Sequence, residues 1–257
     1  EKGCTDTEQI TITEPELALT AAINTKTDVN CKGDATGSAT ASATGGTGTY
    51  SYSWNTSPAQ TSAIANNLIA GTYIVTVTDE KGCTDTEQIT ITEPELALTA
   101  AINTKTDVNC KGDATGSATA SATGGTGTYS YSWNTSPVQT SATANNLIAG
   151  TYIVTVTDEK GCTDTEQITI TEPELALTAA INTKTDVNCK GDATGSATAS
   201  ATGGTGTYSY SWNTSPAQTS AIANNLIAGT YIVTVTDEKG CTDTEQITIT
   251  EPELALT

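Results

Sequence analysis

Apolar and polar residues alternate with a period of two along most of this chain, which is the pattern of half-buried β-strands. The segment YSYSW at 50–54 places three aromatic side chains on one face and serines on the other. The segment TYIVTVT at 72–78 alternates in the same way, and the polar turn DEKG at 79–82 follows it. Two such strands and a tight turn predict the nucleus of an antiparallel β-sandwich.

Further strands complete this predicted sandwich. Residues 39–44 alternate alanine with threonine and serine, so small side chains would face the aromatic ones and leave room for them in a thin core. A short edge strand is predicted over residues 61–66. The LIAG corner at 68–71 precedes a tyrosine, an arrangement typical of immunoglobulin-like sandwiches. The predicted core residues are Trp54, Trp133, Trp212, Tyr73, Tyr152 and Tyr231.

The whole pattern repeats every 79 residues, which is the spacing between Cys4 and Cys83. Self-similarity at a fixed period is the signature of a tandem array of small domains. Only two positions differ between repeats, and they read Ala59, Val138, Ala217 and Ile64, Thr143, Ile222.

The period therefore predicts an all-β tandem array of three immunoglobulin-like antiparallel β-sandwich domains. Residues 1–16 would be the last strand of a truncated preceding repeat plus a linker, and residues 253–257 the start of a following repeat. The complete repeats would cover residues 17–94, 95–173 and 174–252. An EPE sequence joins them, and its proline should end the strand and stiffen the joint. A chain that opens in mid-repeat is expected of a window from a longer array.

The composition argues against two classes of function, nucleic-acid binding and membrane insertion. Ten basic residues against 29 acidic ones give a net charge of −19, which repels phosphate backbones and argues against nucleic-acid binding. No run of 18 apolar residues is present, so no membrane insertion is expected. No signal peptide is visible at Glu1.

The seven cysteines suggest disulfides, because histidine and CxxC spacing are absent and a zinc site is thereby disfavoured. Disulfides would place the protein in an oxidising, extracellular setting. One scheme pairs cysteines within a repeat, and the other pairs them across the EPE linker. We favour the first, although strict immunoglobulin strand order places its partners at opposite ends of the sandwich. The first scheme gives Cys31–Cys83, Cys110–Cys162 and Cys189–Cys241, whereas the second gives Cys4–Cys31, Cys83–Cys110 and Cys162–Cys189.

Candidate chemistry is sparse. Four carboxylates, Asp79, Glu80, Asp85 and Glu87, cluster around the turn near Cys83 and are a weak candidate for Ca²⁺, although the chain lacks a DxDxDG loop. No other metal or cofactor is expected. No catalytic residue is predicted, since the chain has no histidine, no activated nucleophile and no phosphate-binding loop. The YSYSW aromatics could form a sugar-stacking platform if exposed, but their alternation favours a core position.

Several sequence blocks taken together resemble a known family. The string CKGDATGSATASATGGTGTYSYSW, followed by NNLIAGTYIVTVTDEKGCTDTEQITITEP, resembles the SprB-type repeat over essentially every residue of each period. Such repeats occur in very large cell-surface proteins of Bacteroidota, including a gliding-motility adhesin. The resemblance implies export by type IX secretion, a place on the outer cell surface, and a role in gliding or attachment. It supplies no catalytic residue.

The sequence is thus expected to be a non-enzymatic stalk or filament of a secreted cell-surface adhesin. Its partners would be surface glycans or other cell-surface material of unknown identity. One alternative is a carbohydrate-binding module array on a secreted glycan-degrading protein. Another is a self-assembling extracellular fibre, formed through edge strands or by donation of residues 1–14 to a neighbouring chain.

Overall fold

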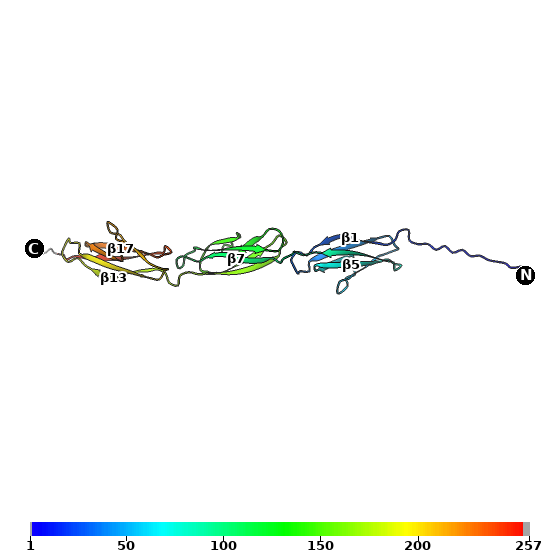
Figure 1. The fold of residues 1–257 in the computed structure, drawn as a ribbon, viewed down its shortest axis with the longest axis horizontal. Helices are drawn as coiled ribbons and strands as arrows, with labels where there is room; N and C mark the ends of the chain where they lie inside the picture. The colour runs from blue at the N-terminus through cyan, green and yellow to red at the C-terminus, as the bar shows by residue number, and fades with distance from the viewer. Residues whose placement is uncertain (1, 254–257) are drawn as a thin grey trace. The chain divides into compact units, whose positions relative to one another are not determined.

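The computed structural model describes residues 2–253. The chain divides into two compact units. Among these residues, the first unit contains 2–99 together with segments 122–129 and 157–164, and the second contains 100–121, 130–156 and 165–253. Within the described residues every regular element is a β-strand (Figure 1).

Each repeat contributes six strands of matching length. In the first repeat they are β1 (Thr20–Thr27), β2 (Gly37–Thr44), β3 (Ser51–Trp54), β4 (Ile64–Leu68), β5 (Gly71–Thr78) and β6 (Thr84–Ile91). In the second they are β7 (Thr99–Thr106), β8 (Gly116–Thr123), β9 (Ser130–Trp133), β10 (Thr143–Leu147), β11 (Gly150–Thr157) and β12 (Thr163–Ile170). In the third they are β13 (Thr178–Thr185), β14 (Gly195–Thr202), β15 (Ser209–Trp212), β16 (Ile222–Leu226), β17 (Gly229–Thr236) and β18 (Thr242–Ile249).

The strand order is that of an immunoglobulin-like sandwich. One sheet of the first repeat has the order β1-β2-β4 and the other the order β3-β5-β6, and both orders recur in the later repeats. These sheets correspond to strands A-B-E and C-F-G of an immunoglobulin domain, without strand D. Adjacent strands within the two sheets of the first repeat are antiparallel. The structure therefore confirms the predicted fold class.

The core lies between the two sheets and is centred on one tryptophan per repeat. Trp54 is 1 % exposed and packs among the alanines of β2 and the valines of β5, as the facing stripes of small and large residues predict. Its Nε1–H donates a hydrogen bond of 2.9 Å to the carbonyl of Ser62, so burial leaves no polar atom of the ring unsatisfied. Trp133 and Trp212 are buried to the same degree.

The tyrosine corner is formed. The Tyr73 hydroxyl donates to the carbonyl of Ile69 at 3.0 Å, which ties the start of β5 back to the preceding turn. Asn67, just before this turn, has a positive φ of 53°, a conformation that asparagine tolerates better than most residues. Tyr152 and Tyr231 make the same bond to Ile148 and Ile227. Tyr73 is half-buried against the core rather than fully inside it.

One of the two positions that vary between repeats lies on the short edge strand. This strand, β4, begins three residues later than the predicted 61–66 and ends two residues later. The Ile64 side chain is 44 % exposed, which explains why threonine is accepted at the equivalent position. There the Thr143 hydroxyl lies 3.0 Å from that of Thr119 on β8 and forms a hydrogen bond with it.

The segment before the first sandwich does not form the predicted strand. Residues 2–14 have no regular structure, and Ile10 and Ile12 are 85 % and 89 % exposed. The identical sequence in β6 is a strand because it pairs along its whole length with β5, whereas residues 2–14 pair with no strand. Of the predicted start of a following repeat, residues 254–257 lie outside the described part.

Candidate functional site

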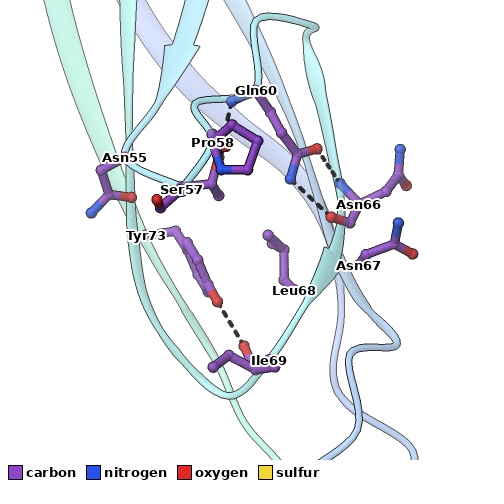
Figure 2. A pocket seen from close by; sticks show the side chains of 10 residues that line it. Asn55, Ser57, Pro58, Gln60, Asn66, Asn67, Leu68, Ile69 and Tyr73 are labelled. Atoms are coloured by element: carbon purple, nitrogen blue, oxygen red, sulfur yellow. Dashed lines mark hydrogen bonds between the residues drawn. The ribbon is translucent and has the colours of Figure 1, made fainter.

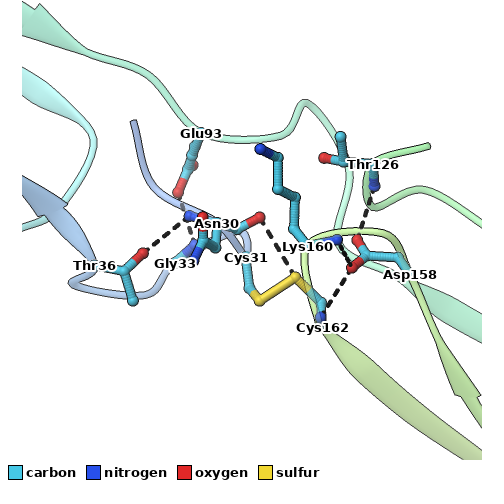
Figure 3. Close-up of a disulfide and its surroundings, with 9 residues drawn as sticks. All are labelled: Asn30, Cys31, Gly33, Thr36, Glu93, Thr126, Asp158, Lys160 and Cys162. Carbon is cyan, nitrogen blue, oxygen red and sulfur yellow. Dashed lines mark hydrogen bonds between the residues drawn. A yellow bond between two sulfur atoms is a disulfide. The ribbon is translucent and has the colours of Figure 1, made fainter. Parts of the chain in front are cut away.

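Two disulfides connect successive repeats. Cys31 of the first repeat is bonded to Cys162 of the second (Figure 3), and Cys110 of the second is bonded to Cys241 of the third. The Cα–Cα distance is 5.6 Å in both, within the usual range for disulfides. Neither of the two predicted pairing schemes is formed, because both bonds join different pairs of cysteines. Cys4, Cys83 and Cys189 remain as free, exposed thiols.

The favoured pairing of Cys31 with Cys83 fails because the two residues lie at opposite ends of the same sandwich. The loop of Cys31 contacts the residues that follow β6, since the N–H of Val29 donates to the carbonyl of Thr92. Cys83 lies in the β5–β6 turn, just before β6 begins, and so at the opposite end of β6 from Thr92. A strand of eight residues spans about 26 Å, far beyond the reach of a disulfide. The geometry of immunoglobulin strand order thus decides against this pair.

We call each disulfide and the two segments that it joins a junction. The first segment is the loop between the first two strands of a repeat, which we call the exit loop; it comprises residues 30–36 and their equivalents 109–115 and 188–194. It is clamped to the linker, because the Gly33 N–H donates to Glu93 Oε2 at 2.7 Å. Lys32 adds a 3.3 Å ion pair with the same carboxylate and a bond to the Glu95 carbonyl. The Gly33 N–H, more than the lysine, holds the pKa of Glu93 below its ordinary value. Glu93, the first glutamate of the EPE linker, therefore has a structural role, because its carboxylate holds the loop that carries Cys31.

The second half is a tight turn that we call the acid turn, residues 79–83 and their equivalents 158–162 and 237–241. In the second repeat the Asp158 carboxylate organises it: Oδ1 accepts from the N–H groups of Lys160 and Cys162 at 2.9 Å each, and Oδ2 accepts from Thr126 at 2.8 Å (Figure 3). Burial by itself would raise the pKa of Asp158, but the backbone donors, led by Thr126 and Cys162, outweigh it and lower the pKa. The carboxylate thus presents the Cys162 sulfur on a rigid turn.

The two halves fit together around the sulfur atoms. Cys162 Sγ lies 3.4 Å from the carbonyl oxygen of Asn30 and is shielded by it, since Cys162 is only 7 % exposed. Beside the bond lies a small hollow of ≈ 350 Å³. It is lined by Cys31, Lys32, Asp34, Ala97, Leu98, Gly161, Cys162 and Thr163. The equivalent hollow of ≈ 320 Å³ lies beside Cys110–Cys241, where Cys241 Sγ is 3.4 Å from the Asn109 carbonyl oxygen.

The carboxylates proposed for Ca²⁺ do not converge. Asp79 uses both oxygens for backbone N–H groups of its own turn and of Thr47, and Asp85 accepts from the Ala21 N–H at 2.8 Å. Glu80 and Glu87 are exposed. Among residues 2–253 no group of three or more acidic, thiol or imidazole side chains has the spacing of a metal site. Asp79 and Asp85 therefore serve as hydrogen-bond acceptors for backbone N–H groups.

A second hollow, of ≈ 560 Å³, opens between the loop after β3 and the end of β4 (Figure 2). The Gln60 side chain bridges it by bonding both backbone groups of Asn66, each at 2.9 Å. Asn55 Oδ1 accepts from the Ile74 N–H at 2.9 Å, and the Tyr73 hydroxyl is engaged in the corner bond. The same hollow recurs between Asn134 and Tyr152. Three of its polar side chains thus hold the corner of the sandwich together.

No sugar platform is formed by the tryptophans, since Trp54 is buried in the core. In the part of the chain that the structure describes, no helix has the length and apolar character needed to cross a bilayer.

Sequence reasoning missed the residues that build the junction. It treated Asp79 as a possible metal ligand and the EPE glutamate only as part of a stiff linker. The signal was present as an aspartate four residues before each cysteine of the acid turn, as in Asp158 and Cys162. Which cysteines pair could not be found in this way, because the partners are 131 residues apart.

Part of each repeat is similar to a known family. Residues 23–59, 102–138 and 181–217 match the family model described as SprB repeat, which confirms the resemblance seen in the sequence. No curated protein matches the chain.

Several solved structures align with most of the chain but superimpose only loosely on it. Three N-terminal domains of the outer capsid protein Hoc of bacteriophage RB49 are 15 % identical, with 92 % of this chain and 100 % of that one covered at a TM-score of 0.37. A 1.5-MDa bacterial ice-binding adhesin is 13 % identical, with 91 % and 98 % covered at a TM-score of 0.35. The eight N-terminal immunoglobulin domains of Down Syndrome Cell Adhesion Molecule are 13 % identical, with 95 % and 37 % covered at 0.38. The fold assignment rests on the strand order and the tyrosine corner.

Proposed function

We propose that these SprB repeats form a non-enzymatic, load-bearing segment of the stalk of a cell-surface adhesin, outside the cell. The observation that carries the proposal is the pair of disulfides between successive repeats, at equivalent positions of the repeating unit. Each junction then has two covalent connections, the EPE linker and the disulfide. A stalk benefits from this arrangement, because one broken connection does not separate its domains.

The location outside the cell is supported by the disulfides, which persist in oxidising compartments and are rare in the cytosol. A net charge of −19 spread over a Thr- and Ser-rich surface keeps such a segment soluble and opposes its collapse. Secretion by the type IX route and a role in gliding or attachment are part of the proposal on the strength of the SprB match. The ligand of the adhesin would be surface glycans or other cell-surface material.

The carbohydrate-binding alternative is weaker. It depended on exposed tryptophans, and Trp54, Trp133 and Trp212 are all 1 % exposed. The strand-donation alternative is also weaker, because each repeat already contains its own copy of the strand that residues 1–14 would supply, as β6 in the first repeat.

A tethering experiment tests the load-bearing role. A protease site inserted between Pro94 and Glu95 would let the first linker be cut while the chain is held by its two ends. We expect the cut chain to stay connected under force, because Cys31–Cys162 still joins the two sides. It should part when a reductant is added.

The matched control carries the same protease site and the substitution Cys162→Ser. This chain should part on cleavage alone. If the unsubstituted chain also parts on cleavage without reductant, the junction carries no load through the disulfide and the proposal is wrong.

A further inference from the structure

The hollow between the loop after β3 and the end of β4, which we call the corner hollow, is lined by uncharged residues. None of the 10 residues around it in the first repeat is acidic or basic, although the chain has 29 acidic and 10 basic residues. The same positions line the corner hollow of the second repeat, where the volume is ≈ 520 Å³. Sites for small molecules commonly have volumes of about 300–1,000 Å³. The corner hollow therefore has the size and the neutral lining of a site for an uncharged ligand.

Apolar side chains form the middle of the corner hollow. Figure 2 shows the Tyr73 ring, Pro58 and Leu68 arranged around it. The Tyr73 ring is half-buried, and its hydroxyl is fixed by the 3.0 Å bond to the Ile69 carbonyl. A tyrosine held in this way presents a flat apolar surface beside a polar tip. This surface suits the C–H groups of a small ring.

Asparagine side chains lie at the margins and are only partly used by the fold. Asn55 lies on one side of Tyr73, and Asn66 and Asn67 lie on the other (Figure 2). Because Asn55 Oδ1 accepts from the Ile74 N–H at 2.9 Å, its Nδ2 group is left to donate outward. Within residues 2–253 the side-chain amides of Asn66 and Asn67 have no hydrogen-bond partner. The margins thus offer several amide groups to the hydroxyls of a ligand.

The segments that carry these groups are fixed without a ligand. The Thr56 hydroxyl accepts from the Gln60 N–H at 2.9 Å and donates to the Pro58 carbonyl at 2.8 Å. The Gln60 amide then joins this loop to the backbone of Asn66 on β4. A site that is formed in advance loses little conformational freedom on binding.

The two positions at which the repeats differ lie beside the corner hollow. Position 59 stands between the lining residues Pro58 and Gln60, and position 64 is on β4, two residues before Asn66. In the second repeat the side chain of Val138 is 60 % exposed and adds an apolar group next to Pro137. The repeats therefore differ only in the surroundings of this hollow.

We propose that the corner hollow binds one ring of a neutral saccharide. The C–H groups of the ring would pack against Tyr73 and Pro58, and its hydroxyls would bond the asparagine amides at the margins. An anionic sugar would meet no cationic lining residue and would be repelled by the net charge of −19. A wholly apolar ligand would leave the asparagine amides that it covered without partners.

This inference rests on the proposed function for the class of partner, surface glycans, and it assigns the contact to the repeats themselves. It does not use the buried tryptophans. The load that a junction carries and the sugar that a hollow binds are separate properties, so each has its own experiment.

The substitution Asn55→Asp tests the proposal. It keeps the Oδ1 atom that accepts from the Ile74 N–H, removes the Nδ2 donor and places a negative charge at the margin. The change is made in every repeat, at Asn55, Asn134 and Asn213, whose Oδ1 atoms accept equivalent bonds. The matched control makes the same change outside the corner hollow, where each Oδ1 atom accepts from a serine hydroxyl, at Asn24, Asn103 and Asn182.

A second variant removes the amide from the opposite margin. Asn67 has a φ of 53°, and its equivalents Asn146 and Asn225 have a φ of 54°, which glycine adopts without strain. Replacing all three by glycine therefore removes the side chains while the backbone keeps its conformation.

Binding is measured on an array of immobilised neutral and acidic glycans. We expect the unsubstituted chain and the Asn24 control to bind the same neutral glycans, and both hollow variants to bind them about tenfold more weakly. Denaturation curves of all four proteins should agree. Absence of binding, a preference for acidic glycans, or undiminished binding by the hollow variants would each overturn the proposal. The tethering experiment, which concerns the disulfides alone, would stand or fall separately.

Discussion

The carbonyl oxygen of Asn30 lies 3.4 Å from the sulfur of Cys162, although the two residues are 132 positions apart in the sequence. This contact shows how a loop of one repeat covers a cysteine sulfur of the next. The β1–β2 loop of the first sandwich places its backbone oxygen over the acid turn of the second repeat, and the disulfide fixes it there. A chain of small domains thereby gains connections between its domains as well as cores within them.

Removing one disulfide should destabilise the chain strongly. On the chain-entropy model a bond that closes a loop of 131 residues contributes about 5 kcal/mol, and real bonds commonly deliver about 2–4. We therefore expect Cys162→Ser to lower the free energy of unfolding by about 2–5 kcal/mol in chemical denaturation.

Cys83→Ser is the matched control, since it changes the same position of the repeat where no bond is formed. Its unfolding should stay within about 0.5 kcal/mol of the unsubstituted chain, as for an ordinary surface substitution. Equal effects of the two substitutions would show that the bond at Cys162 is absent.

Truncation of a core tryptophan should unfold its repeat. Trp54 is 1 % exposed, so Trp54→Ala should cost about 3–5 kcal/mol. Ile64→Thr, on the exposed edge of the same repeat, introduces the residue found at position 143 and should cost little. Denaturation followed by circular dichroism would compare them. Native tryptophan fluorescence at the wavelength typical of a water-exposed indole would contradict the buried position.

Much of the fold followed from the sequence because its signals are local. Alternation predicted the strands, the LIAG segment before Tyr73 predicted the tyrosine corner, and the Ile-to-Thr variation at position 64 predicted the exposed edge. The start of β4 was misplaced because the loop before it is held by side chains, such as the Gln60 amide, that periodicity does not describe. Residues 2–14 lack the strand neighbour that a β-strand requires.

The junction was harder to predict because it depends on which ends of two sandwiches meet. Cys31 has the same sequence surroundings as Cys110, so nothing local distinguishes a partner in the same repeat from one in the next. Strand order decides it, by placing Cys83 at the far end of its own domain. The role of Asp158 was hidden for the same reason, since its carboxylate serves backbone groups that only the folded turn brings together.

Low pH should destabilise the acid turns. The pKa of Asp158 is lowered from its ordinary value of 3.8, because backbone donors outweigh the effect of burial. A lowered pKa in the folded state means that the carboxylate stabilises the fold above about pH 4 and that this contribution is lost as pH falls through the lowered pKa. Stability should therefore decline below pH 3.8.

Asp158→Asn should remove part of this dependence. Its amide can still accept at one oxygen, but its NH₂ would face the Thr126 N–H, so stability at pH 7 should fall and the slope of stability against pH below 4 should flatten. Denaturation curves at several pH values would measure both. An unchanged slope would mean that Asp158 does not contribute to the acid response.

Counting free thiols tests the central claim that the disulfides run between repeats. The seven cysteines form two such bonds in this chain, so an unfolded, unreduced monomer should take up three equivalents of an alkylating reagent, at Cys4, Cys83 and Cys189. Intact-mass spectrometry of the labelled monomer reads this number directly. Pairing within repeats, or across the linkers, would form three bonds and leave a single thiol. Three labels per monomer are what the account predicts, and one label would contradict it.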